Sequence, residues 1–170
     1  MRLFNKKYFL ILFLYNLNYA YSFDNNERYW QEIRRHSKVI FSVSRCSFNK
    51  IENFSNKFSK YYKVSVSEEP VGYVVISEAK SKHQTFDFYI LYSIKGDILK
   101  VSVLSYRENY GYEICNKSWL KQFCNINLEN KFTYLSKIDG ISGSTISVNS
   151  ISNSVYNLSR VLNSNIIKIY

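Results

Sequence analysis

The stretch that decides the fold is TFDFYILYSIKGDILKVSVLSY, residues 85–106. Aromatic and aliphatic side chains occupy alternate positions of residues 85–93, which is typical of a strand with one buried face; they are Phe86, Phe88, Ile90 and Tyr92. Lys95-Gly96-Asp97 then predicts a turn, because glycine adopts a positive φ without steric cost. Residues 98–106 alternate again. The pattern predicts an antiparallel β-hairpin.

Upstream of the hairpin we expect one further strand and two helices. Residues 72–79 are rich in Val, Ile and Tyr and predict a strand. Residues 24–45 predict a helix that Asp24 or Asn25 can cap. Residues 46–66 are harder to interpret. Their apolar side chains recur every three or four residues, which suggests a second short helix; they are Ile51, Phe54, Phe58 and Tyr61 or Tyr62.

Downstream of the hairpin the sequence predicts two helices on either side of an irregular segment. Residues 117–123 favour a short helix, and residues 125–138 show no regular pattern. Residues 145–162 carry one apolar stripe at spacings of three and four; its members are Val148, Ile151, Val155, Leu158 and Leu162. Together these elements predict an α+β fold, with a mostly antiparallel sheet and flanking helices in a single domain.

The first 22 residues are typical of an export signal. Arg2, Lys6 and Lys7 precede a short apolar run at residues 9–15, and small residues follow at the positions that a signal peptidase requires. The run is shorter than the ~20 apolar residues that span a bilayer. An uncleaved membrane anchor is the alternative. We therefore expect an exported protein that is periplasmic, or extracytoplasmic and membrane-associated.

The chain is basic, with a formal net charge of +10, of which three positive charges lie in the expected leader. A basic surface suits nucleic acid, but export argues against that partner. It also suits anionic lipid headgroups or an acidic redox partner. An ordinary solvated surface with a lysine bias is the interpretation that we favour.

The three cysteines, Cys46, Cys115 and Cys124, form no CxxC pair, and no histidine lies at a zinc-like spacing. We expect no metal site. One disulfide can form in an oxidising compartment, although structural thiols are the default expectation.

The last predicted helix opens with the most informative motif of the chain, DGISGST at residues 139–145. The first N–H groups of a helix lack intrahelical partners, and the helix dipole favours negative charge there. The hydroxyl of Thr145 would lie in that field, so the arrangement suits a phosphate group. The alternative is an ordinary serine-rich helix cap.

This motif resembles the attachment motif of the FMN-binding domain family, Asp-x-Ile-Ser-Gly-x-Thr, with Ser144 at a position where the family usually has alanine. Other family motifs agree in order and spacing with exported bacterial members; they are Gly72-Tyr73, Lys82-His83, Gly96, Tyr106-Arg107-Glu108 and Gly111. Residues 23–68 show no such resemblance.

The resemblance implies that Thr145 carries FMN through a phosphoester bond. Ser142 and Gly143 would form a tight turn and offer N–H groups, with Ser144 placing a second hydroxyl beside the acceptor. Asp139 would be needed for recognition by a flavin transferase.

The resemblance also implies that the loop with Glu108 and Gly111 lies against the flavin. Gly111 would let the backbone approach the ring closely. Glu108 would accept a hydrogen bond from a ring N–H, or merely orient the loop. Further candidates are weaker; they are Arg107 for a reduced anionic flavin and Tyr106, Tyr110 and Tyr112 for stacking on the ring.

These expectations divide the chain into a leader at 1–22, an N-terminal helical region at 23–69 and an FMN-binding domain at 70–165. The implied function is electron transfer rather than stand-alone enzyme catalysis, with a flavin transferase and a membrane redox partner. No nucleophile elbow, zinc-protease motif or P-loop is present. Two alternatives stay open: a secreted basic binding module without a cofactor, and a non-covalent flavin binder.

Overall fold

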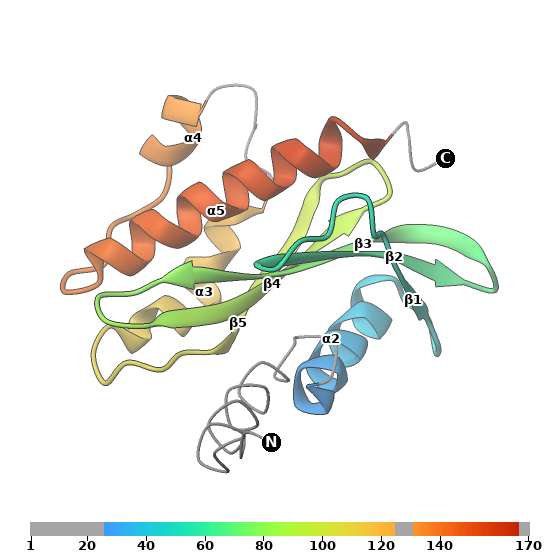
Figure 1. Cartoon of the computed structure of the whole chain (residues 1–170), viewed down its shortest axis with the longest axis horizontal. Helices are drawn as coiled ribbons and strands as arrows, with labels where there is room; N and C mark the ends of the chain where they lie inside the picture. Colours follow the sequence, from blue (N-terminus) through green and yellow to red (C-terminus); the bar gives the residue numbers. More distant parts are fainter. Residues whose placement is uncertain (1–25, 125–130, 167–170) are drawn as a thin grey trace, which may run out of the picture.

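A five-stranded antiparallel sheet forms the middle layer of the protein (Figure 1). The structure is a computed structural model and describes residues 26–124 and 131–166. Helix α5 (Thr145–Asn163) lies along one face of the sheet, and helix α2 (Glu27–Ile40) covers the other. The described elements form a single α+β domain, which confirms the predicted fold class.

The strands are arranged in chain order, and each pairs antiparallel with the next; they are β1 (Ser47–Lys50), β2 (Ser59–Val66), β3 (Glu69–Lys80), β4 (Thr85–Ser93) and β5 (Ile98–Ser105). The predicted hairpin is the β4–β5 pair. Gly96 has a φ of 89°, and its N–H donates to the Ser93 carbonyl at 3.0 Å, which closes the turn as expected.

The alternation of side chains along β3 and β4 gives the sheet two buried faces. One face packs against α5; its largest fully buried rings are Tyr61, Tyr73, Phe86, Phe88 and Tyr92. The opposite face packs against α2; its core is Trp30, Ile33, Tyr62, Val64, Val74, Ile76, Tyr89 and Leu91. Because both faces are covered, a one-residue slip of register would exchange the two cores.

Helix α5 matches the predicted final helix closely. Four members of its apolar stripe are buried and Leu158 is half-buried against the same core. The hydroxyl of Ser159 and that of Tyr92 lie 2.9 Å apart, which ties the helix to β4. Smaller elements complete this side: α3 (Lys117–Leu120), α4 (Lys131–Ser136) and single 3-10 turns at Tyr112–Cys115 and Lys121–Phe123.

The prediction of a second short helix within residues 46–66 is wrong. Residues 47–50 and 59–66 form β1 and β2, which pair with each other and extend the sheet. The side chain of Asn56 accepts hydrogen bonds from the N–H groups of Phe58 and Ser59 and starts β2 with a local turn. The apolar residues that recur every three or four positions therefore lie partly in a loop and partly in a strand. In its described part, residues 26–69, the expected helical region at 23–69 contains one helix and two strands, and residue 69 already belongs to β3.

Two further boundaries differ from expectation. The first helix ends at Ile40 rather than near residue 45, because Ser42 has a φ of 54° and cannot continue it. Its cap is Asn26, whose side chain accepts from the Tyr29 N–H, while Asp24 and Asn25 lie outside the described residues. Lys131–Ser136 forms α4 inside the segment that was expected to be irregular.

The expected leader at 1–22 also lies outside the described residues. In the two described ranges, no helix combines the length and the apolar character that crossing a membrane requires. The three cysteines are free thiols. Burial raises the pKa of the Cys115 thiol to about 11, so this thiol stays protonated at neutral pH.

Candidate functional site

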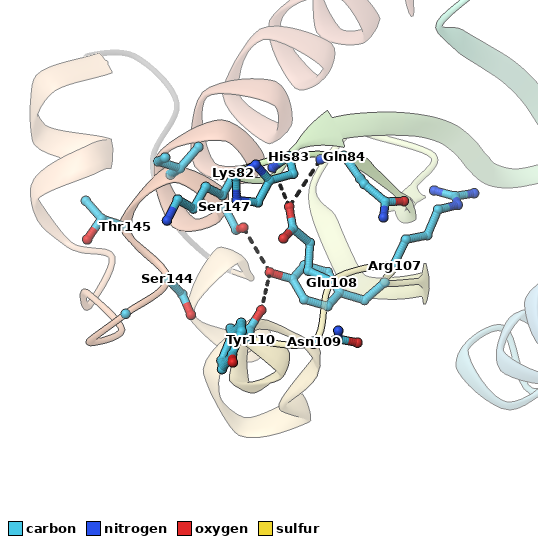
Figure 2. Close-up of a pocket in the computed structure, with 13 residues that line it drawn as sticks. Lys82, His83, Gln84, Arg107, Glu108, Asn109, Tyr110, Ser144, Thr145 and Ser147 are labelled. Carbon is cyan, nitrogen blue, oxygen red and sulfur yellow. Dashed lines mark hydrogen bonds between the residues drawn. The ribbon is translucent and has the colours of Figure 1, made fainter.

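A cavity of about 710 Å³ opens between three segments that are far apart in the sequence (Figure 2). Its wall is made by the β3–β4 turn, the loop after β5 and the start of α5. The lining residues are Lys82, His83, Gln84, Tyr106, Arg107, Glu108, Asn109, Tyr110, Gly143, Ser144, Thr145, Ile146 and Ser147.

The antiparallel topology explains why these segments meet. The end of β3, the start of β4 and the end of β5 lie at the same end of the sheet, as the pairing of Asp87 with Ser105 shows. The first turns of α5 reach this end as well, since the Lys80 N–H donates to the Ser150 hydroxyl at 2.7 Å. One helix start and two chain reversals are thereby brought together.

Glu108 fastens the loop after β5 to the β3–β4 turn. One carboxylate oxygen, Oε1, accepts from the hydroxyl of Ser81 at 2.6 Å, from the N–H of His83 at 2.6 Å and from the N–H of Gln84 at 3.1 Å. The hydrogen bonds from the His83 N–H and the Ser81 hydroxyl hold the pKa of the Glu108 carboxyl below its usual value. Of the two roles expected for Glu108, the geometry favours orienting the loop.

Arg107 is turned away from the centre of the cavity (Figure 2). Its guanidinium forms an ion pair with Asp87 and donates to the Thr85 carbonyl at 2.9 Å. Asp87 is only 4% exposed and also accepts from the Tyr29 hydroxyl at 2.5 Å. Burial and this hydrogen bond raise the pKa of Tyr29 to about 12. Since its charge is committed to Asp87, Arg107 is a poor candidate for stabilising a reduced flavin.

Tyr106 joins the loop after β5 to α5. Its hydroxyl lies 3.1 Å from the Ser147 hydroxyl and donates to the Tyr110 carbonyl, also at 3.1 Å. Gly111 packs beneath this contact with a φ of 79°. A Cβ at Gly111 would lie 2.6 Å from the Ser144 hydroxyl and 2.9 Å from that of Tyr106. Glycine is therefore favoured here, by its positive φ and because a Cβ would crowd these two side-chain hydroxyl groups.

The start of α5 presents unused hydrogen-bond donors. The Ser144 N–H donates to the Ile141 carbonyl, and the first helical bond runs from Val148 to the Ser144 carbonyl. Between them, the N–H groups of residues 145–147 have no acceptor among the described residues. The first turn contains no acidic side chain. The helix start is thus open to an anion.

Ser144 adds a further polar atom at this point. It is 4% exposed, and its hydroxyl has no hydrogen-bond partner within the described part of the chain. A buried hydroxyl without a partner is costly, so a group that supplies one would be favoured here.

The structure brings four of the predicted site residues to the cavity: Glu108, Gly143, Ser144 and Thr145. Gly111 lies directly behind the wall, against Ser144. Ser142 and Asp139 are exposed and do not line the cavity. The backbone of Asp139 is held instead, with its carbonyl accepting from the Trp119 indole and its N–H donating to the Gln122 side chain, both at 2.9 Å.

Sequence reasoning missed much of the wall. Lys82 and His83 belonged to a recognised motif but were not predicted to line the site, a surface or capping role being favoured for His83. Gln84, Asn109, Ile146 and Ser147 were not singled out as site residues. The two-residue periodicity on either side of residues 81–84 was the available signal, since it places this turn beside the end of β5. Of the tyrosines, Tyr106 and Tyr110 line the cavity and Tyr112 does not.

Comparison with known proteins identifies this region. Residues 82–159 match the model of the FMN-binding domain family. The chain contains an FMN-binding domain. The match begins at Lys82 and includes all three segments of the cavity wall. The presence of this domain indicates that the cofactor is FMN. A comparison with curated proteins gave no match.

The cavity of the FMN-binding domain fits its cofactor on three observations. Its volume falls within the range of about 300–1,000 Å³ that is usual for small-molecule and cofactor sites. Unused N–H groups at residues 145–147 suit the phosphate group. The buried Ser144 hydroxyl and the exposed Tyr110 ring offer a polar contact and a stacking surface.

Proposed function

We propose that the protein is an extracytoplasmic electron-transfer flavoprotein whose FMN is joined to Thr145 by a phosphoester bond. The observation that carries this proposal is the position of Thr145. The residue is exposed, opens α5 and lines the cavity of the FMN-binding domain, beside backbone donors that have no acceptor among the described residues. A phosphate bound there would already lie next to the hydroxyl that attacks it.

The attachment forms one bond and breaks another. The Thr145 hydroxyl oxygen binds the phosphorus of FMN and loses its proton, while the bond from phosphorus to a leaving group breaks. The donor is therefore an activated flavin nucleotide of the pyrophosphate class, and a separate flavin transferase supplies it and accelerates the step. In this scheme Asp139, which is exposed and lies six residues before Thr145, is a contact for the transferase.

The chain's own residues hold the flavin and shield it. FMN supplies reversible electron transfer, and the protein determines its position and its electrostatic surroundings. Gly111 allows the loop after β5 to lie close to α5, and Tyr106 locks this contact. Tyr110, which is 84% exposed, forms a rim on which an aromatic ring can stack.

The location and the partner are part of the same proposal. The charged, then apolar, leader at residues 1–22 supports export. The formal net charge, +10 for the full chain and +7 without the three cations of the leader, suits a membrane surface or an acidic redox partner. We propose that a membrane-bound reductase or acceptor exchanges electrons with the flavin and that nucleic acid is not a partner.

The proposal is tested by exporting the full chain together with a flavin transferase. Wild type, Thr145→Ala and Ser142→Ala are compared by flavin fluorescence after denaturing electrophoresis and by intact mass. Ser142→Ala is the matched control, because this exposed hydroxyl lies in the same motif but outside the cavity wall. We expect fluorescent bands for wild type and Ser142→Ala, a dark band for Thr145→Ala, and a mass increase of one FMN less one water.

Other outcomes assign a different function. A dark wild-type band from a protein that is yellow before denaturation would indicate a non-covalent flavin binder. If the Thr145→Ala band is fluorescent and the band of a Ser144→Ala variant is dark, the flavin is attached to the neighbouring hydroxyl of Ser144.

A further inference from the structure

Lys82 is a cation of the cavity wall whose charge is not paired with any group of the described residues. Its side chain is exposed, and it makes no hydrogen bond or ion pair within residues 26–124 and 131–166. Figure 2 shows it extending from the β3–β4 turn toward the side of the cavity on which Thr145 lies. The other strong cation of the wall, Arg107, is bound to Asp87.

The backbone around Lys82 is fixed although its side chain is not. The three donors that reach Glu108 Oε1 come from Ser81, His83 and Gln84, which flank Lys82 on both sides. The Ser81 N–H donates to the Gln84 carbonyl at 2.8 Å, and this closes the turn. The direction in which Lys82 leaves the turn is therefore set from the opposite wall by one carboxylate.

The same contacts explain why Glu108 does not neutralise Lys82. Its hydrogen bonds are all made with the turn, and no ion pair joins it to Lys82 within the described ranges. The cavity therefore has a free ammonium on one wall and unused N–H groups of α5 on another. These groups are complementary to a phosphate with at least one negative charge.

We propose that Lys82 recognises the phosphate group of the flavin and that Glu108 is the positioning residue that aims it. This inference rests on the proposed function, because it seats the phosphate at the start of α5 beside Thr145. It assigns to Lys82 the discrimination between phosphorylated and unphosphorylated flavins. It also assigns to Glu108 a role through the turn rather than through the flavin ring.

The test compares the binding of FMN and of riboflavin to the unloaded full chain, produced without a flavin transferase. Quenching of flavin fluorescence gives a Kd for each ligand. In the wild type we expect FMN to bind more tightly than riboflavin. Lys82→Met should weaken FMN binding about tenfold, the effect of losing one charge-assisted hydrogen bond, and leave riboflavin binding unchanged. Lys80→Met is the matched control, since Lys80 is an exposed lysine next to the same turn but outside the wall.

The positioning role of Glu108 is tested by coupling. Glu108→Ala should reduce the preference for FMN over riboflavin in the wild-type background and have no further effect on it in Lys82→Met. Glu108→Gln keeps an acceptor oxygen for the turn and should retain most of the preference. Circular dichroism of each variant checks that the fold is intact.

The outcomes separate this inference from the proposed function. If the wild type binds neither flavin, both the inference and the assignment of the cavity fail. If FMN binds the wild type and Lys82→Met equally, or if Lys82→Met weakens both flavins equally, only the inference fails. An effect of Lys80→Met as large as that of Lys82→Met would show a general charge effect and would likewise overturn it. Additive losses in the Glu108→Ala, Lys82→Met pair would overturn the positioning role.

Discussion

Gly111 packs directly against two side-chain hydroxyl groups, in a space that leaves no room for a Cβ. The residue combines a left-handed conformation with contacts to the hydroxyl groups of Ser144 and Tyr106. Two steric reasons therefore favour glycine at this position. An L-residue is strained at this φ, and its Cβ would push the loop away from α5.

We predict that Gly111→Ala lowers the free energy of unfolding by about 1–3 kcal/mol. Gly140→Ala is the control, because a Cβ at Gly140 meets nothing within 4 Å and its φ does not lie in the left-handed region; it should change stability by no more than about 0.5 kcal/mol. Urea denaturation of both variants gives the comparison. Equal stabilities would contradict the packing role assigned to Gly111.

At this scale the sequence predicted the site in part. Thr145, Ser144 and Gly143 lie on the cavity because they belong to one contiguous helix start, where local chemistry is sufficient. Glu108 was also expected there, but its three bonds to the β3–β4 turn were not, because they join residues more than 20 positions apart. For the same reason, the large separation in sequence, the position of Lys82 on the cavity wall was not predicted. A motif locates a residue along the chain, whereas only strand register says what lies opposite.

At the scale of elements, the packing of α2 against the sheet includes a contact made by a histidine. His36 Nδ1 lies 2.5 Å from the Tyr89 hydroxyl, and a neutral imidazole accepts this hydrogen bond. Burial, with the positive charges of Lys100, Arg35 and Lys117, lowers the pKa of His36 to about 4. Glu32 lies 3.9 Å away and opposes this effect.

We predict that stability decreases as the pH falls from about 6.5 to about 4. Because its pKa is lower in the folded state, His36 binds its proton less readily than in the unfolded chain, so acid favours unfolding over this window. The effect should be smaller than the ~1.4 kcal/mol per pH unit of one fully coupled proton, since the group is partly solvated. Urea unfolding at pH 7.5 and 5.0 measures it. His36→Gln should reduce the loss, and the same substitution at the exposed His83 should not.

Element prediction succeeded where one periodicity extended over a whole element. The β4–β5 hairpin and α5 follow periods of two and of three to four with few interruptions, and both were predicted within a residue or two. Residues 51–62 failed because Ile51 and Phe54 lie in a turn, whereas Tyr61 and Tyr62 face opposite sides of β2. Apolar residues from a turn and from the following strand thus had, by chance, the spacing of three and four that is typical of a helix.

At the scale of the whole molecule, one buried carboxylate connects α2, the sheet and the loop that shapes the cavity. Asp87 on β4 binds Tyr29 of α2 and Arg107 of the cavity loop. The loop that shapes the site on the α5 side is thus anchored through the end of the sheet to a helix on the other side.

We predict that Tyr29→Phe lowers the free energy of unfolding by about 1–2 kcal/mol, because it removes a donor from a buried carboxylate while keeping the ring. Tyr110→Phe, at a residue that is 84% exposed, should have no measurable effect on unfolding. Urea denaturation tests both. If the two variants unfold alike, the contact between Tyr29 and Asp87 contributes nothing to stability.

The pairing of β4 between β3 and β5 also limits how the cofactor-binding part can be isolated. The family match begins at residue 82, yet β4 is paired along its length with β3, which ends at Lys80. A recombinant fragment trimmed to the limits of the match would expose the hydrogen-bonding edge of its longest remaining strand and two large apolar surfaces, a combination that promotes self-association. The unit that recognises the flavin and the unit that folds therefore have different boundaries, and a transplantable flavin module from this chain has to begin before α2.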